Sequence, residues 1–498
     1  MSTAAAPTPL TLHRGASAVT AGNNRVAVAP GNNNRAHLAN LETLFRNRGA
    51  AAVESAEPVR PVVGKKQPLL RLPSFLAGRT TTTTEPAAAA PALSPRRLER
   101  LLQPVAPDGP SPRGDIAASW RRLHGEDGWR GLLDPLHPDL RRELVRHGEF
   151  VDAAYGAFLS RPDAAPSGTS TTTRGPVPLQ DAAYRVTAPL FATASVGLPP
   201  WLAAAAPCAA QRTSLVGYVA VCDSAAEVRR MGRRDIVVAL RGTCTVLEWA
   251  ENVRAGLVPA TDDSNSSSSN SPDEAKVECG FWNLYKTAAG DGSPSLSQMV
   301  VSEIRKLLDT YKGEEISITV TGHSLGAALA VLIADELAGG VAAAAKAPVA
   351  VFSFGGPRVG NRAFASRVEA RGARVLRVVN AHDVVPRFPP RLTLPVVPGY
   401  ADVGRELRLD SRASPYLRPD ADAACCHDLE AYIHLVDGFL GSHCPFRANA
   451  KRSILRLVKN QGGNVKQLYI SKAKDMRIRL DGADMSAGAA NTVVECVH

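Results

Sequence analysis

The sequence lacks any apolar run of about 18 residues, because Pro, Arg or Asp interrupts each alanine-rich stretch. A membrane-spanning helix needs about 20 predominantly apolar residues, so we expect contact with membranes to be peripheral only. The eight cysteines include no C-x-x-C pair and show no regular zinc-ligand spacing. We therefore expect reduced, mostly buried thiols.

Acidic residues are absent from residues 1–41, where Arg14, Arg25 and Arg35 lie among Ala, Ser, Thr and Asn. A secretory signal needs an apolar core of about 7–15 residues, and this segment has none. Its composition is typical of an organelle transit peptide, with an ordinary disordered tail as the alternative. Chloroplast import is favoured, and mitochondrial import is the rival prediction.

Positive charge is concentrated at the start of the chain. Residues 1–100 contain 13 Lys and Arg against five Asp and Glu, so +8 of the formal net charge of +11 lies there. The remainder is nearly neutral. A nucleic-acid-binding domain would carry its charge on the folded body, so nucleic acid is not expected as a partner.

Composition divides the chain into three parts. Residues 1–114 include a threonine run and an Ala-Pro run, which bury too little apolar area to offset chain entropy. A globular domain is predicted at residues 115–478, beginning with a helical pattern at 139–158, and a tail at 479–498. Inside the domain, residues 261–275 are Ser-rich and aperiodic, which predicts a flexible surface insertion.

Five short apolar, β-branched runs predict strands. They lie at residues 215–222, 235–240, 316–320, 349–354 and 375–379. Continuous apolarity is typical of strands that helices cover on both faces. Helical patterns at 295–308 and 327–337 lie between the later runs. This order predicts an α/β fold with a mostly parallel central sheet flanked by helices.

Residues 322–326, Gly-His-Ser-Leu-Gly, follow one predicted strand directly and precede a strong helix former. Strand, tight turn and helix in this order are the context of a nucleophile elbow. The two glycines leave room in a strained turn, and the following helix N-terminus adds a positive dipole end. We therefore predict that Ser324 is a catalytic nucleophile.

A serine nucleophile needs a histidine that takes its proton and a carboxylate that holds the histidine's tautomer. In α/β-hydrolases the acid follows a later strand and the histidine comes last in the chain. Asp383 lies in the loop after the predicted strand at 375–379, whereas Asp402 and Asp410 lie farther from any strand end. Asp383 is therefore the predicted acid.

Four histidines follow the predicted acid: His427, His434, His443 and His498. His427 opens an amphipathic stretch, where a residue at a loop-to-helix junction can point into a cleft, and is the favoured base. His434 lies seven residues farther, near the same helical face, and stays open as the alternative. His382, beside the acid, is interpreted as scaffold.

An oxyanion needs two donors, and one is the backbone N–H after the nucleophile, here Leu325. The predicted strand at 235–240 ends in Arg-Gly-Thr, so Thr243 is the second candidate, with a simple strand-ending turn as the alternative. Directly afterwards, apolar residues recur at helical spacing: Val246, Leu247, Trp249 and Val253. They predict either an amphipathic lid helix over the serine or a core helix.

Residues 444–479 carry ten Lys and Arg and one acid, Asp475. Such a patch can steer a protein towards anionic lipid surfaces. A solvated charged face is the alternative interpretation.

Six motifs carry a resemblance to a known family. They are WRGLLDPL at 129–136, GRRDI at 232–236, RGT at 241–243, GHSLG at 322–326, FGGPR at 354–358 and HDLEAY at 427–432. Over residues 120–474 the chain resembles the class 3 lipases, and in particular the plastidic class I phospholipases A1 of plants, of the Defective-in-Anther-Dehiscence type. Two departures are Cys244, where relatives commonly carry Ala, and the Ser-rich insertion.

The resemblance implies an α/β-hydrolase fold, a triad of Ser324, Asp383 and His427, and no metal cofactor. It also implies hydrolysis of the sn-1 acyl ester of phospholipids, and often of galactolipids or triacylglycerols. The released fatty acids can feed jasmonate synthesis. Two other functions stay open: a soluble acyl esterase or thioesterase, and an inactive lipase-like scaffold that binds protein partners.

Overall fold

The computed structural model describes residues 114–160, 177, 179, 181–195, 211–243, 256–261, 274–290, 292–389, 399–414, 417–437, 457 and 463–466. Several predictions fall on segments outside these described residues: the transit peptide, the lid helix, nearly all of the Ser-rich insertion, and the C-terminal tail. They stay predictions.

A seven-stranded sheet forms the centre of the molecule, with the strand order β1-β2-β3-β6-β7-β8-β9. The strands are β1 (Tyr184–Ser195), β2 (Gln211–Cys222), β3 (Arg234–Leu240), β6 (Ile316–His323), β7 (Val349–Phe354), β8 (Arg374–Asn380) and β9 (Arg405–Leu409). The pairs β1–β2 and β2–β3 are antiparallel, and every pair from β3 to β9 is parallel. The predicted mostly parallel sheet is thereby confirmed. Two short strands, β4 (Leu257–Pro259) and β5 (Lys276–Glu278), pair separately.

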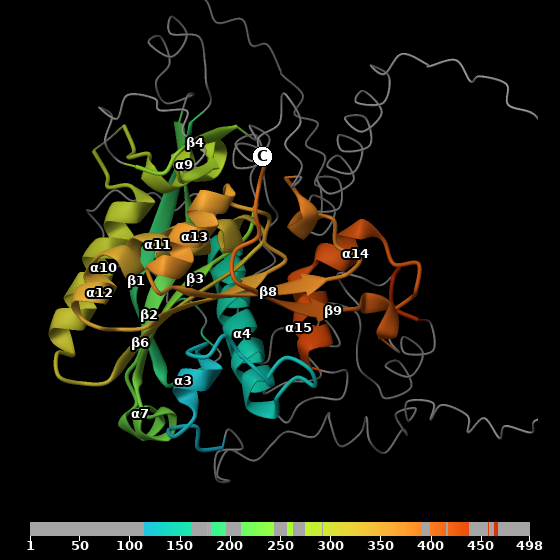
Figure 1. Cartoon of the computed structure of the whole chain (residues 1–498), viewed down its shortest axis with the longest axis horizontal. Helices are drawn as coiled ribbons and strands as arrows, with labels where there is room; N and C mark the ends of the chain where they lie inside the picture. Colours follow the sequence, from blue (N-terminus) through green and yellow to red (C-terminus); the bar gives the residue numbers. More distant parts are fainter. Residues whose placement is uncertain are drawn as a thin grey trace, which may run out of the picture.

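Helices cover both faces of this sheet (Figure 1). On one face, α10 (Leu296–Thr310) and α11 (Leu325–Gly339) pack in a core with Ile236 and Val238. On the other, α4 (Pro138–Ser160) and α15 (Leu429–Asp437) pack in a second core with Val237 and Ala239. Because alternate side chains of one strand enter different cores, the central strands are apolar throughout, as the sequence predicts.

The remaining helices are short. They are α3 (Trp120–Leu123), α7 (Ala225–Met231), α9 (Cys279–Lys286), α12 (Val341–Ala344), α13 (Arg362–Ala370) and α14 (Ala423–His427), with 3-10 turns at Val385–Arg387 and Ser411–Ala413. In the part of the chain that the structure describes, no helix is long and apolar enough to cross a membrane. Of the four cysteines in the described part of the chain, Cys222, Cys425 and Cys426 are buried.

The two edge strands of the main sheet, β1 and β9, were not predicted from the sequence. β1 contains Pro189, which cannot donate a ladder hydrogen bond and is tolerated at a sheet edge. β9 reads Arg-Glu-Leu-Arg-Leu, and only Leu407 of its five residues is buried. Both strands therefore lack the continuous apolar pattern that marks the central ones.

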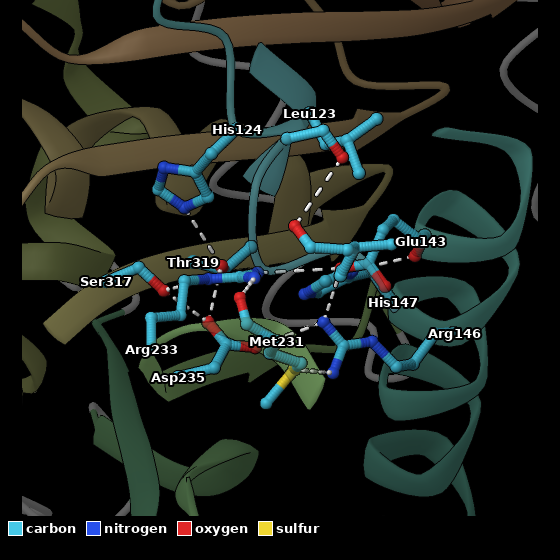
Figure 2. Close-up of polar contacts among 12 residues, drawn as sticks. Leu123, His124, Glu143, Arg146, His147, Met231, Arg233, Asp235, Ser317 and Thr319 are labelled. Atoms are coloured by element: carbon cyan, nitrogen blue, oxygen red, sulfur yellow. Dashed lines mark hydrogen bonds and ion pairs between the residues drawn. The ribbon is translucent and has the colours of Figure 1, made fainter. Parts of the chain in front are cut away.

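Four charged side chains are buried together near the amino ends of β3 and β6 (Figure 2). We call Glu143, Arg146, Arg233 and Asp235 the charge cluster. Arg146 Nη2 lies 3.2 Å from Asp235 Oδ2 and 2.5 Å from Glu143 Oε2, and Arg233 Nη2 lies 3.5 Å from Glu143. The cluster joins α4 to the sheet, at the end of β3 away from Thr243.

Three hydroxyls donate hydrogen bonds to the cluster's aspartate: that of Tyr184 on β1, which donates to Asp235 Oδ2 over 2.8 Å, and two from β6. Ser317 Oγ and Thr319 Oγ1 donate to Asp235 Oδ1 over 2.9 and 3.0 Å. Burial acts to raise the pKa of Asp235, but Arg233 and Arg146 outweigh it and hold the pKa well below its usual value. Asp235 is therefore an anion at neutral pH.

Candidate active site

Ser324 lies between the last residue of β6 and the first residue of α11. Its φ of 56° and ψ of −123° place a non-glycine residue in a sparsely populated backbone region. Its N–H donates to the carbonyl of Phe354, 3.0 Å away, which anchors the turn to β7. The predicted sequence of strand, tight turn and helix is present, and the serine is only partly buried.

The two glycines that flank this turn are required by close backbone packing. A Cβ on Gly322 would lie 2.3 Å from the carbonyl oxygen of Gly326. A Cβ on Gly326 would lie 2.4 Å from the carbonyl oxygen of Arg241. Neither contact is possible without moving backbone, so the Gly-x-Ser-x-Gly pattern here has a steric cause.

His427 connects the serine to a buried carboxylate. Its Nε2 lies 2.8 Å from Ser324 Oγ, and its Nδ1 lies 2.7 Å from Asp383 Oδ2. An ionised carboxylate only accepts hydrogen bonds, so Nδ1 carries the proton and Nε2 presents its lone pair to the serine hydroxyl. This arrangement suits removal of the serine proton by the imidazole.

The loop after β8 holds Asp383, which is 1 % exposed. Its Oδ1 accepts the N–H of Val385 at 2.9 Å, and its Oδ2 accepts the hydroxyl of Tyr432 at 2.7 Å as well as His427. Burial and the nearby Asp383 raise the pKa of Tyr432 well above its ordinary value, so the phenol stays a donor. Sequence reasoning placed Tyr432 in a motif and assigned it no role.

Asn380, the last residue of β8, ties the acid's loop to the helix that carries the histidine. Its Nδ2 donates to the carbonyl of Cys426, 2.9 Å away, and its Oδ1 accepts the N–H of Ser411 at 3.1 Å. Sequence reasoning missed this residue too. Its one available signal was an uncharged polar residue directly after the apolar pair Val378 and Val379, at the end of the strand.

The alternative candidates have other partners. His434 Nε2 lies 2.9 Å from Ser414 Oγ, Asp402 pairs with Arg358 at 2.8 Å, and Asp410 accepts from His382 at 3.0 Å. The structure thus brings His427 to the serine and places His434 elsewhere. His443 and His498 lie outside the described residues.

The turn after β3 lies directly against the serine. A Cβ on Gly242 would come within 3.0 Å of Ser324 Cβ, so the neighbouring Thr243 is beside the nucleophile. Leu325 begins α11, and a helix provides no internal acceptor for its first N–H groups. Leu325 thus directly follows Ser324, and the turn that leads to Thr243 lies against the serine. The predicted lid residues 246, 247, 249 and 253 lie outside the described residues. No set of three or more His, Cys, Asp or Glu that could hold a metal ion occurs within the described part of the chain.

Comparisons with known proteins identify a family and several relatives. Residues 237–393 match the family described as Lipase (class 3). The chain is similar to the Arabidopsis thaliana protein named Phospholipase A(1) DAD1, chloroplastic, with 38% identity over 452 residues that cover 81% of this chain and 99% of the relative. It is also similar to Phospholipase A1-II 6 of Oryza sativa subsp. japonica, with 39% identity over 70% of this chain and 87% of the relative.

Among solved structures, a lipase from Rhizopus microsporus var. chinensis matches with 21% identity and a TM-score of 0.33, over 55% of this chain and 75% of that one. The family assignment rests on the sequence relatives, one of which is matched over almost its whole length. The chain belongs to the plant phospholipase A1 family of class 3 lipases, and it is a carboxylic ester hydrolase with the α/β-hydrolase fold.

Proposed function

We propose that the chain is a phospholipase A1 that cleaves the sn-1 acyl ester of membrane phospholipids, with Ser324 as nucleophile, His427 as base and Asp383 as the orienting acid. The observation that carries the proposal is the pair of hydrogen bonds made by His427: its Nε2 lies 2.8 Å from Ser324 Oγ, and its Nδ1 lies 2.7 Å from Asp383 Oδ2. Relatives named phospholipases A1 support the substrate class.

The reaction proceeds in two halves. Ser324 Oγ attacks the ester carbonyl while its proton passes to His427 Nε2, and the N–H groups of Leu325 and Thr243 stabilise the oxyanion. The lysolipid leaves with the proton from His427. Water then loses a proton to the same nitrogen and attacks the acyl-enzyme, which releases the fatty acid and regenerates the serine.

The proposal extends to galactolipids and triacylglycerols, because their esters present the same carbonyl to the serine. It also includes supply of the fatty acid to jasmonate synthesis, which rests on the family resemblance alone. For location we propose the chloroplast, reached through the leader at residues 1–114, because residues 1–41 of it have a transit-peptide composition and relatives are named chloroplastic. Lipid contact is proposed to be peripheral.

One assay tests enzyme, substrate and position together. Purified protein is given phospholipids that carry different acyl chains at sn-1 and sn-2, and the released fatty acids are identified. Release of the sn-1 chain is expected, with turnover reduced about 10⁴-fold or more in Ser324→Ala. Release of the sn-2 chain would refute the A1 assignment, and full turnover by Ser324→Ala would refute the nucleophile.

Two controls separate the competing functions. A rate that rises sharply once lipid aggregates form supports action at lipid surfaces, whereas a rate that follows monomer concentration supports a soluble esterase. Covalent labelling of Ser324 by a fluorophosphonate supports a competent nucleophile, and failure to label would favour a scaffold.

A fluorescent fusion of residues 1–114 distinguishes chloroplast from mitochondrial import.

A further inference from the structure

Tyr155, on α4, contacts two parts of the active site at once. Its hydroxyl oxygen lies 2.8 Å from Nδ1 of His323 and accepts the N–H of Gly242 at 2.8 Å. Gly242 is in the turn that leads to Thr243, and His323 immediately precedes the serine. A single phenol therefore joins a helix to both sides of the nucleophile.

His323 continues the connection to the base. Its Nε2 lies 2.7 Å from the carbonyl oxygen of His427, and the two imidazole rings lie 4.8 Å apart between centroids. His323 is only 5 % exposed. Its pKa is lowered well below the ordinary value, mainly by burial and to a lesser extent by the nearby His427. The ring is therefore neutral and carries one proton only.

The direction of each hydrogen bond follows from elementary donor and acceptor chemistry. The carbonyl of His427 can only accept, so the proton of His323 sits on Nε2, and Nδ1 must accept from the Tyr155 hydroxyl. The phenol oxygen then receives the N–H of Gly242. Three bonds thus run in one sense, from Gly242 through Tyr155 and His323 to the backbone of His427.

We infer that Tyr155 and His323 are positioning residues that fix the oxyanion turn and the backbone of His427 relative to Ser324. The inference rests on the proposed triad. Because Tyr155 accepts the N–H of Gly242, the turn that leads to Thr243 is held at a fixed distance from α4. Because His323 holds the carbonyl of His427, the imidazole has a fixed point from which to reach the serine.

Fixed positions matter because a displacement of about 1 Å between reacting groups can cost about a hundredfold in rate. The four residues come from α4, the turn after β3, the end of β6 and α14, so no local backbone geometry relates them. A Cβ on Gly242 would lie 2.3 Å from the Tyr155 hydroxyl, which shows how closely the turn is held against the phenol.

The test is Tyr155→Phe, which keeps the ring and removes the hydroxyl. On a soluble p-nitrophenyl ester we expect kcat to fall about tenfold to a hundredfold with KM within about twofold, because the turn and the base matter most in the transition state. The rate of labelling by a fluorophosphonate, which requires the same two elements, should fall in parallel.

The matched control is Tyr218→Phe. Tyr218 also donates its hydroxyl to α4, at the carbonyl of Phe150 over 2.8 Å, and is buried in the same core without contacting the triad. It should lower the thermal unfolding temperature and leave kcat within about twofold. If both variants lose stability and keep kcat, Tyr155 is only structural and the inference is overturned.

His323→Gln provides a second route if Tyr155→Phe does not fold. We expect His323→Gln to lower kcat and leave KM unchanged. Where Tyr155→Phe does fold, the losses of the two single variants should be much less than additive in the double variant, because both break the same series of hydrogen bonds. Unchanged kcat or full additivity would overturn the inference. Ser324→Ala, measured alongside, tests the proposed function itself: an inactive Ser324→Ala with a fully active Tyr155→Phe rejects only the positioning role.

Discussion

Two buried polar regions lie at opposite ends of β3 and β6. At the carboxyl ends, Ser324 is partly exposed, has a positive φ and is served by groups from α4, α14 and the loop after β8. At the amino ends, the charge cluster is fully enclosed and its carboxylates are surrounded by arginines and hydroxyls. α4 contributes to both, through Tyr155 and Arg146.

The difference concerns what each set of hydrogen bonds achieves. The cluster uses its bonds to compensate buried charge, so removing one member leaves the others uncompensated and costs stability. The active site uses its bonds to hold a reactive group in a strained conformation, which persists only because the surrounding structure is firm. The same two strands thus serve folding at one end and chemistry at the other.

After loss of the nucleophile itself, the largest effect should come from Asp383→Asn. The amide can donate to His427 Nδ1 and so favours the tautomer that places a proton on Nε2, facing the serine. We expect kcat about 10⁴-fold lower with thermal unfolding shifted by only a few degrees, measured by ester hydrolysis and calorimetry. A large loss of stability would mean that Asp383, like the charge cluster, mainly stabilises the fold, and the contrast between the two regions would not hold.

Asp235→Ala should show the reverse. The substitution removes the carboxylate that compensates the buried charges of Arg146 and Arg233. The free energy of unfolding, measured by denaturant titration, should therefore fall by about 3–5 kcal/mol. The kcat per labelled serine should stay within about twofold. A fall in kcat without a fall in stability would link the cluster to the chemistry instead.

As the pH falls, two buried histidines beside the charge cluster, His124 and His147, should destabilise the folded protein before the carboxylates of the cluster become protonated. Burial and Arg233 lower the pKa of His124 to about 3, and burial and Arg146 lower that of His147 to about 4. The unfolded chain binds these protons from about pH 6.5 downwards while the folded chain does not, so stability is lost as pH falls from 6.5 towards 4, by up to about 1.4 kcal/mol per pH unit for each ring.

Equilibrium unfolding at pH 7, 6, 5 and 4 measures this loss. His124→Gln can still donate to Thr319 Oγ1, which His124 Nε2 contacts at 3.1 Å, and removes one titrating ring. Its stability should therefore fall less steeply with acid than that of the natural protein. Equal slopes would show that His124 is not one of the groups responsible.

The smallest effect should come from Tyr432→Phe. Asp383 keeps the N–H of Val385 and the imidazole of His427 but loses one donor, so we expect kcat about tenfold to a hundredfold lower, since a hydrogen bond to a charged group is worth about 1.5–3 kcal/mol. Steady-state kinetics on a soluble ester checks the value. A change confined to KM would mean that the phenol shapes the substrate site rather than the acid.

Sequence reasoning was most informative where local pattern and tertiary packing impose the same requirement. The central strands are continuously apolar because two cores meet them, and the elbow glycines are small because backbone lies within 2.4 Å of their Cβ positions. The strands β1 and β9 were not predicted from the sequence, because each pairs with a single neighbour among the described strands and its composition is correspondingly mixed.

The choice between His427 and His434 as the catalytic base could not be made from the sequence alone. His427 and His434 would share a face if their helix were continuous, as the spacing suggests. The structure interrupts it at Asp428, whose extended backbone ends α14 and whose carboxylate accepts the N–H groups of Glu430 and Ala431 at the start of α15. The two rings therefore face different neighbours.

By itself, the sequence determined the α/β order, the sharp turn that presents Ser324, and the strand end that carries Asp383, because each depends on residues adjacent in the chain. Only the tertiary structure decided which histidine meets the serine and which distant side chains, Tyr155, Tyr432 and Asn380, hold the site in place. These contacts join residues 44 to 168 positions apart, and no local pattern records which of them will meet.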